Sequence, residues 1–265
     1  MNTKMKLMNY KKNHIIFLGI LSLSVFMGCK EDVKEELEEE QQQIRKETNL
    51  TESGEIGGHT YVDLGLSVKW ATYNVGAQKN TERGDLFAWG ETDAKETYAT
   101  RSMFDTISHK WLIETDLLFP DVYATKYNVD STSIYFDNKS VLEKEDDAAS
   151  VNWGDPWRMP TYEEFTELKK NTDCEEIADY NGSGVTCLVL TSKINGNKIV
   201  FPLDTRLNFF ELKHITLMSC WTSSISREFA EDTGAYVFMF YMSSFYMDDA
   251  IDSRLGRHTI RAVTK

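Results

Sequence analysis

From Gly58 onward, hydrophobic and polar residues fall into short segments that mostly predict β-strands. Leu66 to Trp70 alternates apolar and polar residues, which is typical of a half-buried strand. Ala235 to Met242 reads AYVFMFYM, a continuous apolar run expected of a central strand buried on both faces. Further short strands are expected at Gly84–Glu91, Val185–Lys193, Lys198–Pro202 and Thr259–Val263, and Asn195-Gly196 predicts a hairpin between the second and third of these.

Two short helices are expected in the middle of this pattern. Residues 146–149, Asp-Asp-Ala-Ala, place acids in a first turn, where the helix dipole favours them. Thr161 and Glu164 have the spacing of a capping box, in which the hydroxyl accepts from the Glu164 amide and the carboxylate reaches back. Phe165 and Leu168 then lie on one face, so this helix should pack against the core.

The first 28 residues predict a secretory signal rather than a folded element. Four lysines precede Ile15–Met27, which carries no charge and is shorter than the roughly 20 apolar residues of a membrane-spanning helix. Gly28-Cys29 at its end resembles the lipobox of bacterial lipoproteins, in which the cysteine thiol receives a diacylglyceryl group. The alternative is an ordinary signal peptide followed by an incidental cysteine.

Residues 29–57 are expected to form an acidic tether. Apolar residues are sparse in this segment, and high charge with low hydrophobicity predicts disorder. Lys30-Glu31-Asp32 resembles the export signal of surface lipoproteins of Bacteroidota, although these residues could simply begin the tether. We therefore expect a lipid-anchored protein of the outer membrane that faces the exterior.

Charge restricts the partners that this chain can have. The whole chain holds 29 Lys plus Arg against 42 Asp plus Glu, and removal of residues 1–28 leaves 25 against 42, a formal net charge of −17. Nucleic-acid binding depends on cationic contacts to phosphate, so it is excluded as a function class. Flat attachment to anionic lipid is disfavoured for the same reason. Contact with the membrane is expected through the Cys29 lipid alone.

Cysteine usage leaves the redox state open. Cys174, Cys187 and Cys220 follow Cys29, so one of these three has no partner within the chain. An exported protein can oxidise two of them. Cys174 and Cys187 flank a short glycine-containing loop and form the favoured pair, but three pairings remain open.

The stretch NWGDPWRMPTYEEF, residues 152–165, raises the question of a ligand site. It combines two tryptophans, Trp153 and Trp157, with Arg158 and with Pro160-Thr161 at the start of a helix. Aromatic faces and a guanidinium can bind a sugar. The alternative is a structural role. Indoles pack in cores with their N–H groups hydrogen-bonded, and an arginine can bond backbone carbonyls or an acid and so stabilise a turn.

Six stretches together resemble the Fibrobacter succinogenes major paralogous domain, which is common in lipoproteins of Bacteroidota. They are YVDLGLSVKWATYNVGA (Tyr61–Ala77), GDLFAWGET (Gly84–Thr92), DDAASVNWGDPWRMPTYEEFTEL (Asp146–Leu168), CWTSSIS (Cys220–Ser226), AYVFMFY (Ala235–Tyr241) and GRHTIRAV (Gly256–Val263). They span nearly all of residues 58–265. The sequence departs from the family at Ala262, where proline is usual, and at residues 201–204.

The resemblance implies an α+β fold of the C-type-lectin-like kind, with two short helices flanking an irregular, mostly antiparallel sheet closed by the terminal strands. It also implies structural roles for the motif residues, which are Trp153, Trp157, Arg158, Pro160, Thr161, Trp221 and Arg261. Arg158 and Arg261 are then expected to bond backbone carbonyls or an acid. The ligand surface, if these residues are structural, is better sought in the weakly patterned residues 92–144, which include Trp111, and near Asp248.

Specific chemistry is poorly supported. The Glu-Pro-Asn or Gln-Pro-Asp loop and the Trp-Asn-Asp strand of calcium-dependent lectins are missing, so a solvated acidic loop is favoured over calcium at Asp248, Asp249 and Asp252. The histidines lack zinc-binding spacing, and there is no Gly-x-Ser-x-Gly elbow or phosphate-binding glycine loop. Cys220 in CWTSS is interpreted as buried packing rather than as a nucleophile. We expect neither enzymatic activity nor a cofactor.

The sequence as a whole therefore predicts a surface-anchored lipoprotein with a binding domain at 58–265, serving adhesion or the recognition of a glycan or a protein. The alternative is a structural or accessory subunit of a surface assembly such as a fimbria. A fold by itself does not decide between them.

Overall fold

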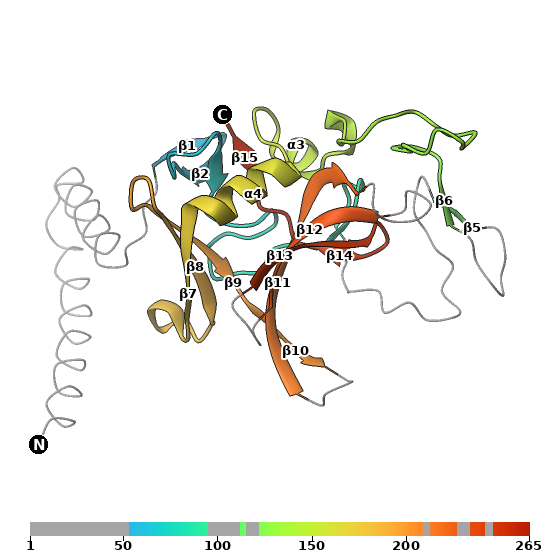
Figure 1. The fold of residues 1–265 in the computed structure, drawn as a ribbon. Coiled ribbons are helices and arrows are strands. Elements are labelled where there is room, and N and C mark those ends of the chain that lie inside the picture. Colours follow the sequence, from blue (N-terminus) through green and yellow to red (C-terminus); the bar gives the residue numbers. More distant parts are fainter. Residues whose placement is uncertain (1–52, 95–111, 115–121, 209–212, 227–233, 242–245) are drawn as a thin grey trace, which may run out of the picture. The chain divides into compact units, whose positions relative to one another are not determined.

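The computed structural model describes residues 53–94, 112–114, 122–208, 213–226, 234–241 and 246–265 (Figure 1). Two α-helices lie in these ranges, α3 (Ala148–Trp153) and α4 (Tyr162–Asn171), with 3₁₀ turns η1 (Lys144–Asp146) and η2 (Tyr180–Gly182). The strands are β1 (Gly54–Ile56), β2 (His59–Val62), β3 (Lys69–Ala71), β4 (Phe87–Ala88), β5 (Leu112–Glu114), β6 (Val122–Ala124), β7 (Thr172–Ile177), β8 (Cys187–Ser192), β9 (Lys198–Pro202), β10 (Asp204–Asn208), β11 (Lys213–Ile225), β12 (Gly234–Tyr241), β13 (Tyr246–Ser253), β14 (Arg257–His258) and β15 (Val263–Thr264).

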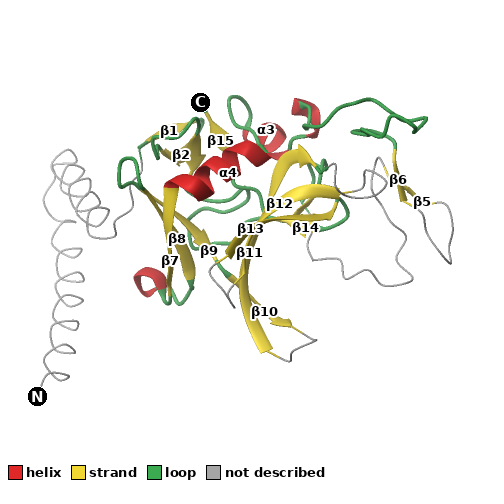
Figure 2. Cartoon of the chain, viewed as in Figure 1, coloured by secondary structure: helices red, strands yellow, loops and turns green. Residues whose placement is uncertain are grey.

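The described strands form several small antiparallel sheets, so the fold class is α+β (Figure 2). One four-stranded sheet has the order β1-β2-β3-β15, which places the last strand beside one of the first. A second has the order β10-β11-β12-β13, and a three-stranded sheet follows the order β7-β8-β9. The pairs β14-β4 and β5-β6 complete the set.

Helix α4 begins with the capping box that the sequence predicts. The Thr161 hydroxyl accepts from the Glu164 amide at 3.4 Å, and the Glu164 carboxylate accepts from the Thr161 amide at 2.9 Å. The acids before α3 act differently from the prediction: Asp147 is the N-cap, accepting from the Ser150 amide at 2.9 Å, and Asp146 lies in η1. An N-cap carboxylate satisfies an amide that the first helical turn leaves unpaired.

The buried face of α4 joins two sheets. Phe165 and Leu168 are buried, as predicted, and the helix packs against β11, β12 and β13. The Phe165 ring lies between Trp70 of β3, with centroids 4.9 Å apart, and Phe238 of β12, with centroids 4.3 Å apart. This aromatic stack fixes the helix to both sheets.

Most of the predicted strands are present. Val68 and Trp70 are buried while Lys69 is half-buried, as the alternation predicts, but the strand β3 begins only at Lys69 and residues 66–68 are not part of it. Strand β12 is central, between β11 and β13. The hairpin β8–β9 is confirmed, but its connection runs over residues 193–197, longer than a two-residue Asn-Gly turn.

The predicted last strand at 259–263 has the wrong bounds. Residues 259–262 are buried and connect β14 to β15 without pairing along one strand. The Ile260 carbonyl accepts from the Val75 amide and the Ala262 carbonyl from the Ala71 amide, each at 2.9 Å. Because this segment runs through the core, its backbone groups bond to β3, to the loop after β3 and to β11.

The folded part begins before the predicted boundary at Gly58, since β1 pairs with β2 from Gly54 onward. Residues 50–265 form one compact unit. The signal segment, Cys29 and the tether up to residue 52 lie outside the described residues. Among the described residues, no helix has the length and apolar character needed to span a membrane.

Candidate functional site

Residues 152–165 form a tied corner between α3 and α4. Trp157 is buried, and its Nε1 donates to the Ile56 carbonyl at 3.0 Å. Trp153 stacks on His59 with ring centroids 3.8 Å apart and planes 7° apart. Burial lowers the pKa of His59, and the nearby charge of Glu55 opposes this shift. Each indole therefore has a structural partner on the strands β1 and β2.

Arg158 makes both kinds of bond expected of it. Its guanidinium bonds the two Glu164 oxygens at 2.5 and 2.8 Å and also donates to the Met159 carbonyl at 3.0 Å. The hydrogen bond to Glu164 raises the pKa of Arg158. The carbonyl of Pro160 accepts from the Ser223 amide at 2.8 Å. The corner is thus bonded to its own helix and to β11.

Arg261 is fully buried and bonds four neutral oxygens. Its nitrogens donate to Oδ1 of Asn74 and to the carbonyls of Ala71, Thr72 and Val200 at 2.7–3.2 Å. Burial lowers its pKa to about 10, so it remains cationic at neutral pH. The residue joins the first sheet to β9 and has a structural role.

Trp221 also packs structurally. It is fully buried, and its Nε1 donates to the Phe87 carbonyl at 2.7 Å. Trp89 is likewise buried and donates to the Thr222 carbonyl at 2.9 Å. The two indoles therefore cross-link β4 and β11, and neither presents a face to a ligand.

The favoured disulfide between Cys174 and Cys187 is not formed. All three thiols, including that of Cys220, are free. In the β7–β8 register, Cys174 faces Leu190 whereas Cys187 faces Ile177. The two cysteines are thus three residues apart along the strands, about 10 Å, and a disulfide needs Cα atoms within about 7 Å.

Cys220 is suited to packing rather than to nucleophilic chemistry. It is fully buried, with Sγ 3.1 Å from Oγ1 of Thr259. Burial raises its pKa, and a thiol is reactive only as the thiolate.

A Ser-His-Asp contact that the sequence analysis missed lies beside this cysteine. Nδ1 of His258 is 2.8 Å from Oγ of Ser219, and Nε2 is 2.8 Å from Oδ2 of Asp252. Ser219 and His258 are only 4% and 5% exposed, so the serine hydroxyl is covered by the surrounding protein. The chain separation of 39 residues between serine and histidine gave no sequence signal. The group ties β11, β13 and β14 together.

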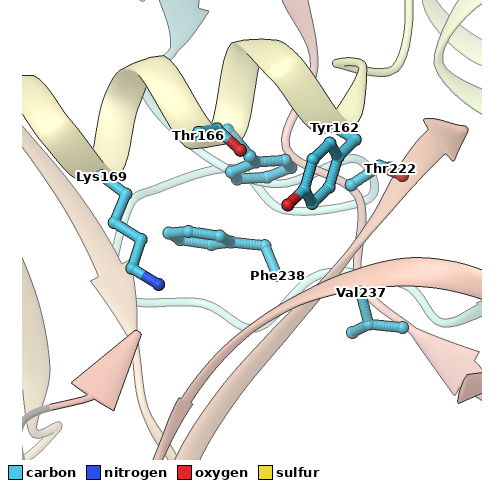
Figure 3. Close-up of a pocket in the computed structure, with 7 residues that line it drawn as sticks. Tyr162, Thr166, Lys169, Thr222, Val237 and Phe238 are labelled. Carbon is cyan, nitrogen blue, oxygen red and sulfur yellow. The ribbon is translucent and has the colours of Figure 1, made fainter. Parts of the chain in front are cut away.

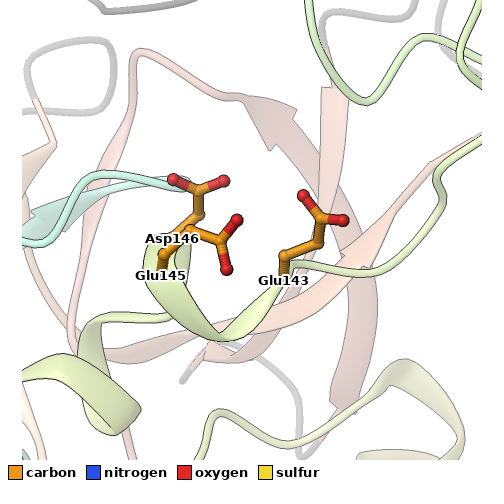
Figure 4. Close-up of side chains that lie close together, drawn as sticks. All are labelled: Glu143, Glu145 and Asp146. Atoms are coloured by element: carbon orange, nitrogen blue, oxygen red, sulfur yellow. The ribbon is translucent and has the colours of Figure 1, made fainter.

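The acidic residues Glu143, Glu145 and Asp146 bring carboxylate oxygens within 4.8 Å of one another (Figure 4). A cation of the protein already lies there: Nζ of Lys126 is 2.9 Å from Glu143 and 2.5 Å from Asp146. This cluster is a salt-bridge network. Asp248 and Asp249, which the sequence placed in a loop, belong to β13, and the Asp252 carboxylate bonds His258.

A shallow groove lies between α4 and β12 (Figure 3). It holds about 210 Å³ of empty space including open solvent, less than the roughly 300 Å³ of small ligand pockets. Its lining residues are Tyr162, Phe165, Thr166, Lys169, Thr222, Val237 and Phe238. The stacked Phe165 and Phe238 rings belong to the core, so little room remains for a ligand.

Residues 128–138, here called the aromatic loop, expose a run of apolar side chains. Ile134 is 90% exposed, Tyr135 37% and Phe136 45%. The three are consecutive, and an exposed apolar run of this kind marks an interaction site more often than a lone exposed residue does. The loop falls within residues 92–144, where the sequence analysis expected a ligand surface, whereas Trp111 lies outside the described residues.

Hydrogen bonds to two side chains close the base of the aromatic loop. The Asp137 carboxylate accepts from the amides of Tyr127, Asn128 and Lys139 at 2.8–3.1 Å. The Asn128 amide group donates to the Ala124 carbonyl at 2.9 Å and to the Ser133 hydroxyl at 3.1 Å. Asn and Asp commonly build turns in this way. The loop therefore has a defined conformation while its tip stays in solvent.

The loop is anchored to the core through Tyr127. This side chain is buried, its hydroxyl donates to Asp146 at 2.7 Å, and its ring lies edge-on to Trp89 at 5.3 Å. Arg254 is fully buried and donates to the carbonyls of Lys126 and Tyr127 at 3.0 and 2.7 Å. The aromatic loop is thus the site in the described part of the chain that combines exposure, apolar chemistry and a rigid support.

Comparison with known proteins adds no assignment: no protein-family model, no curated protein and no solved structure matches the chain.

Proposed function

We propose that this chain is a lipid-anchored recognition protein of the bacterial outer surface. Cys29 carries the lipid, residues 29 to about 52 hold the domain away from the membrane, and the domain has a C-type-lectin-like fold. The pairing of β15 with β3 supports that fold, because it closes a sheet with the terminal strands. So do the two short helices and the small antiparallel sheets.

The observation that carries the recognition function is the aromatic loop. Tyrosine and phenylalanine supply large contact areas at a low cost in side-chain entropy, and a preformed loop loses little backbone entropy on binding. Exposing Ile134, Tyr135 and Phe136 to water costs free energy that a partner can recover by covering them. A binding role accounts for this arrangement.

The second candidate, a subunit of a surface assembly, is favoured by one feature of the sheet. Strand β13 pairs only with β12 among the described strands, and β10 pairs only with β11. An unpaired edge can accept a strand from another chain. A stable complex of fixed stoichiometry in detergent extracts supports this candidate over transient recognition.

The recognition function is tested by probing a glycan array and a panel of extracellular proteins with the full chain. Each ligand found is measured again with the double variant Ile134→Ser, Phe136→Ser. We expect at least one ligand whose binding the double variant weakens about tenfold. A screen without ligands, or ligands that bind both proteins equally, would contradict the proposal.

The anchoring is tested separately. Metabolic labelling with a radioactive fatty acid should mark the chain and should fail for Cys29→Ala. Protease added to intact cells should remove the domain from the surface. Protection of the chain until the outer membrane is opened would contradict surface exposure.

A further inference from the structure

We propose that the partner of the aromatic loop is a protein with an apolar pocket and a basic rim, and not a glycan. This inference rests on the proposed function, since it names the partner class of the same loop.

The first argument is the chemistry of the loop tip. Sugars bind proteins through hydrogen bonds and through stacking on flat aromatic rings. The most exposed side chain here is Ile134, at 90%, which is branched and has no polar group. Such a side chain gains most by entering an apolar pocket that excludes water, as anchor residues of protein interfaces do.

The second argument is the charge around the loop. Residues 126–147 contain three lysines and six acids. Each of these lysines is already ion-paired: Lys126 with Glu143 and Asp146, Lys139 with Glu143, and Lys144 with Asp155. Asp146 and Asp147 are buried, so four acids and three lysines of this segment remain at or near the surface and leave it slightly negative, as is the chain as a whole at −13.

Asp130 is a charged residue of the aromatic loop itself, four positions before Ile134. The residue is exposed, and hydrogen bonds from Thr132 lower its pKa, so it is ionised at neutral pH. A partner that covers Ile134 must place some group near this carboxylate. Complementary charge speeds association and rejects acidic competitors, so lysines or arginines at the rim of the pocket fit best.

A charged lipid surface fits less well. Insertion of the loop tip would carry the Asp130 carboxylate of the same loop towards anionic head groups, and the lysines that could oppose this are ion-paired with their partners. An apolar pocket in a basic protein satisfies both the apolar tip and the charge.

The test uses three peptides as probes with the full chain in detergent. The first is an amphipathic helical peptide of leucine and lysine, the second has the same leucine pattern with glutamate, and the third has serine in place of leucine with the same lysines. We expect the leucine–lysine peptide to bind about tenfold more tightly than either other peptide, and we expect its binding to weaken as sodium chloride is raised.

Two variants tie this binding to the loop. The change Ile134→Ser with Phe136→Ser should weaken leucine–lysine binding about tenfold. The control is Ile194→Ser, which removes an isoleucine that is 58% exposed in the β8–β9 connection, and its affinity should equal that of the unchanged protein. Equal loss in both variants would show non-specific adhesion and would overturn the inference.

Other outcomes separate the inference from the proposed function. Loop-dependent binding of a glycan, or of the leucine–glutamate peptide, leaves recognition standing but overturns a basic protein partner. If none of the three peptides binds but an array ligand of another class binds through the loop, recognition again stands and a basic protein partner is overturned. No binding to peptides or arrays overturns both.

Discussion

At the scale of single residues, Asp252 links the stability of the sheet to pH. Oδ2 of its carboxylate lies 2.8 Å from Nε2 of His258, and the Asp252 side chain is 45% exposed. Burial is the largest single influence and raises the pKa of Asp252, but the hydrogen bond and charge of His258 and the hydrogen bond from the Ser253 amide together outweigh burial and leave the pKa below its ordinary value. A carboxyl group whose pKa is lower in the folded state stabilises that state when ionised.

The sign of this effect gives a prediction for Asp252→Asn. The stabilisation is present above about pH 4, the unfolded value, and is lost as pH falls through the folded pKa. At pH 7 the variant should lower the free energy of unfolding by about 0.5–1 kcal/mol, because the pair is half-exposed. Urea unfolding at several pH values should show this difference shrinking as the pH falls below about 4. A difference that persists unchanged in acid would contradict the assignment. The exposed Asp155→Asn is the control and should change little.

Individual residues also show which side-chain contacts can be predicted from the sequence and which cannot. Arg158 and Glu164 are six apart beside a capped helix, so their bond is local and could be anticipated. The partners of Arg261 lie 61–190 residues away, so the sequence suggested bonding to carbonyls without identifying them. Asp252 and His258 are six residues apart across the turn that joins β13 to β14, whereas Ser219 lies 39 residues from His258 and approaches it only in the folded chain.

At the scale of elements, the capping box is the most local of the stabilising devices. Replacing Thr161 by alanine removes the acceptor for the Glu164 amide and should lower the free energy of unfolding by about 1 kcal/mol. The control is Thr166→Ala in the same helix, where alanine favours helix formation and should cost less. Thermal or urea unfolding of both variants measures the difference. Equal loss in the two variants would mean that the cap contributes nothing.

The register of β7 and β8 makes a prediction for the cysteines. Cys174 is half-buried whereas Cys187 and Cys220 are fully buried. Alkylation of the native protein should therefore label Cys174 first, and all three should react after unfolding without a reductant. Peptide mass spectrometry reads both results. A cross-linked peptide containing Cys174 and Cys187 would contradict the strand register.

Helices and strands with strong local sequence signals were predicted well, whereas the segments that connect them were not. The capping box, the β8–β9 hairpin and the apolar β12 depend on residues close in sequence. The bounds of the last strand were wrong because the Ala262 carbonyl bonds to Ala71 at the end of β3 and the Ile260 carbonyl bonds to Val75 in the loop that follows. The aromatic loop was missed as a unit because Asn128 and Asp137 close it across nine residues without a hydrophobic period.

At the scale of the whole molecule, a tryptophan-rich core supports the exposed aromatic loop. Trp70, Trp89, Trp157 and Trp221 are buried and hold together strands that are only a few residues long. This packing supports Tyr127 and Arg254, which anchor the base of the aromatic loop. The residues of the sequence motifs thus stabilise the fold, and the proposed recognition depends on residues outside them.

The most direct test of this account compares three proteins with the leucine–lysine peptide by titration calorimetry: the unchanged chain, the double variant Ile134→Ser, Phe136→Ser, and Asp137→Ala. The last variant keeps every apolar side chain at the tip but removes the acceptor of three backbone amides at the loop base. We expect about tenfold weaker binding for the double variant and a smaller loss for Asp137→Ala, with the thermal unfolding of the domain largely retained. Equal dissociation constants for all three proteins would contradict recognition through a preformed aromatic loop.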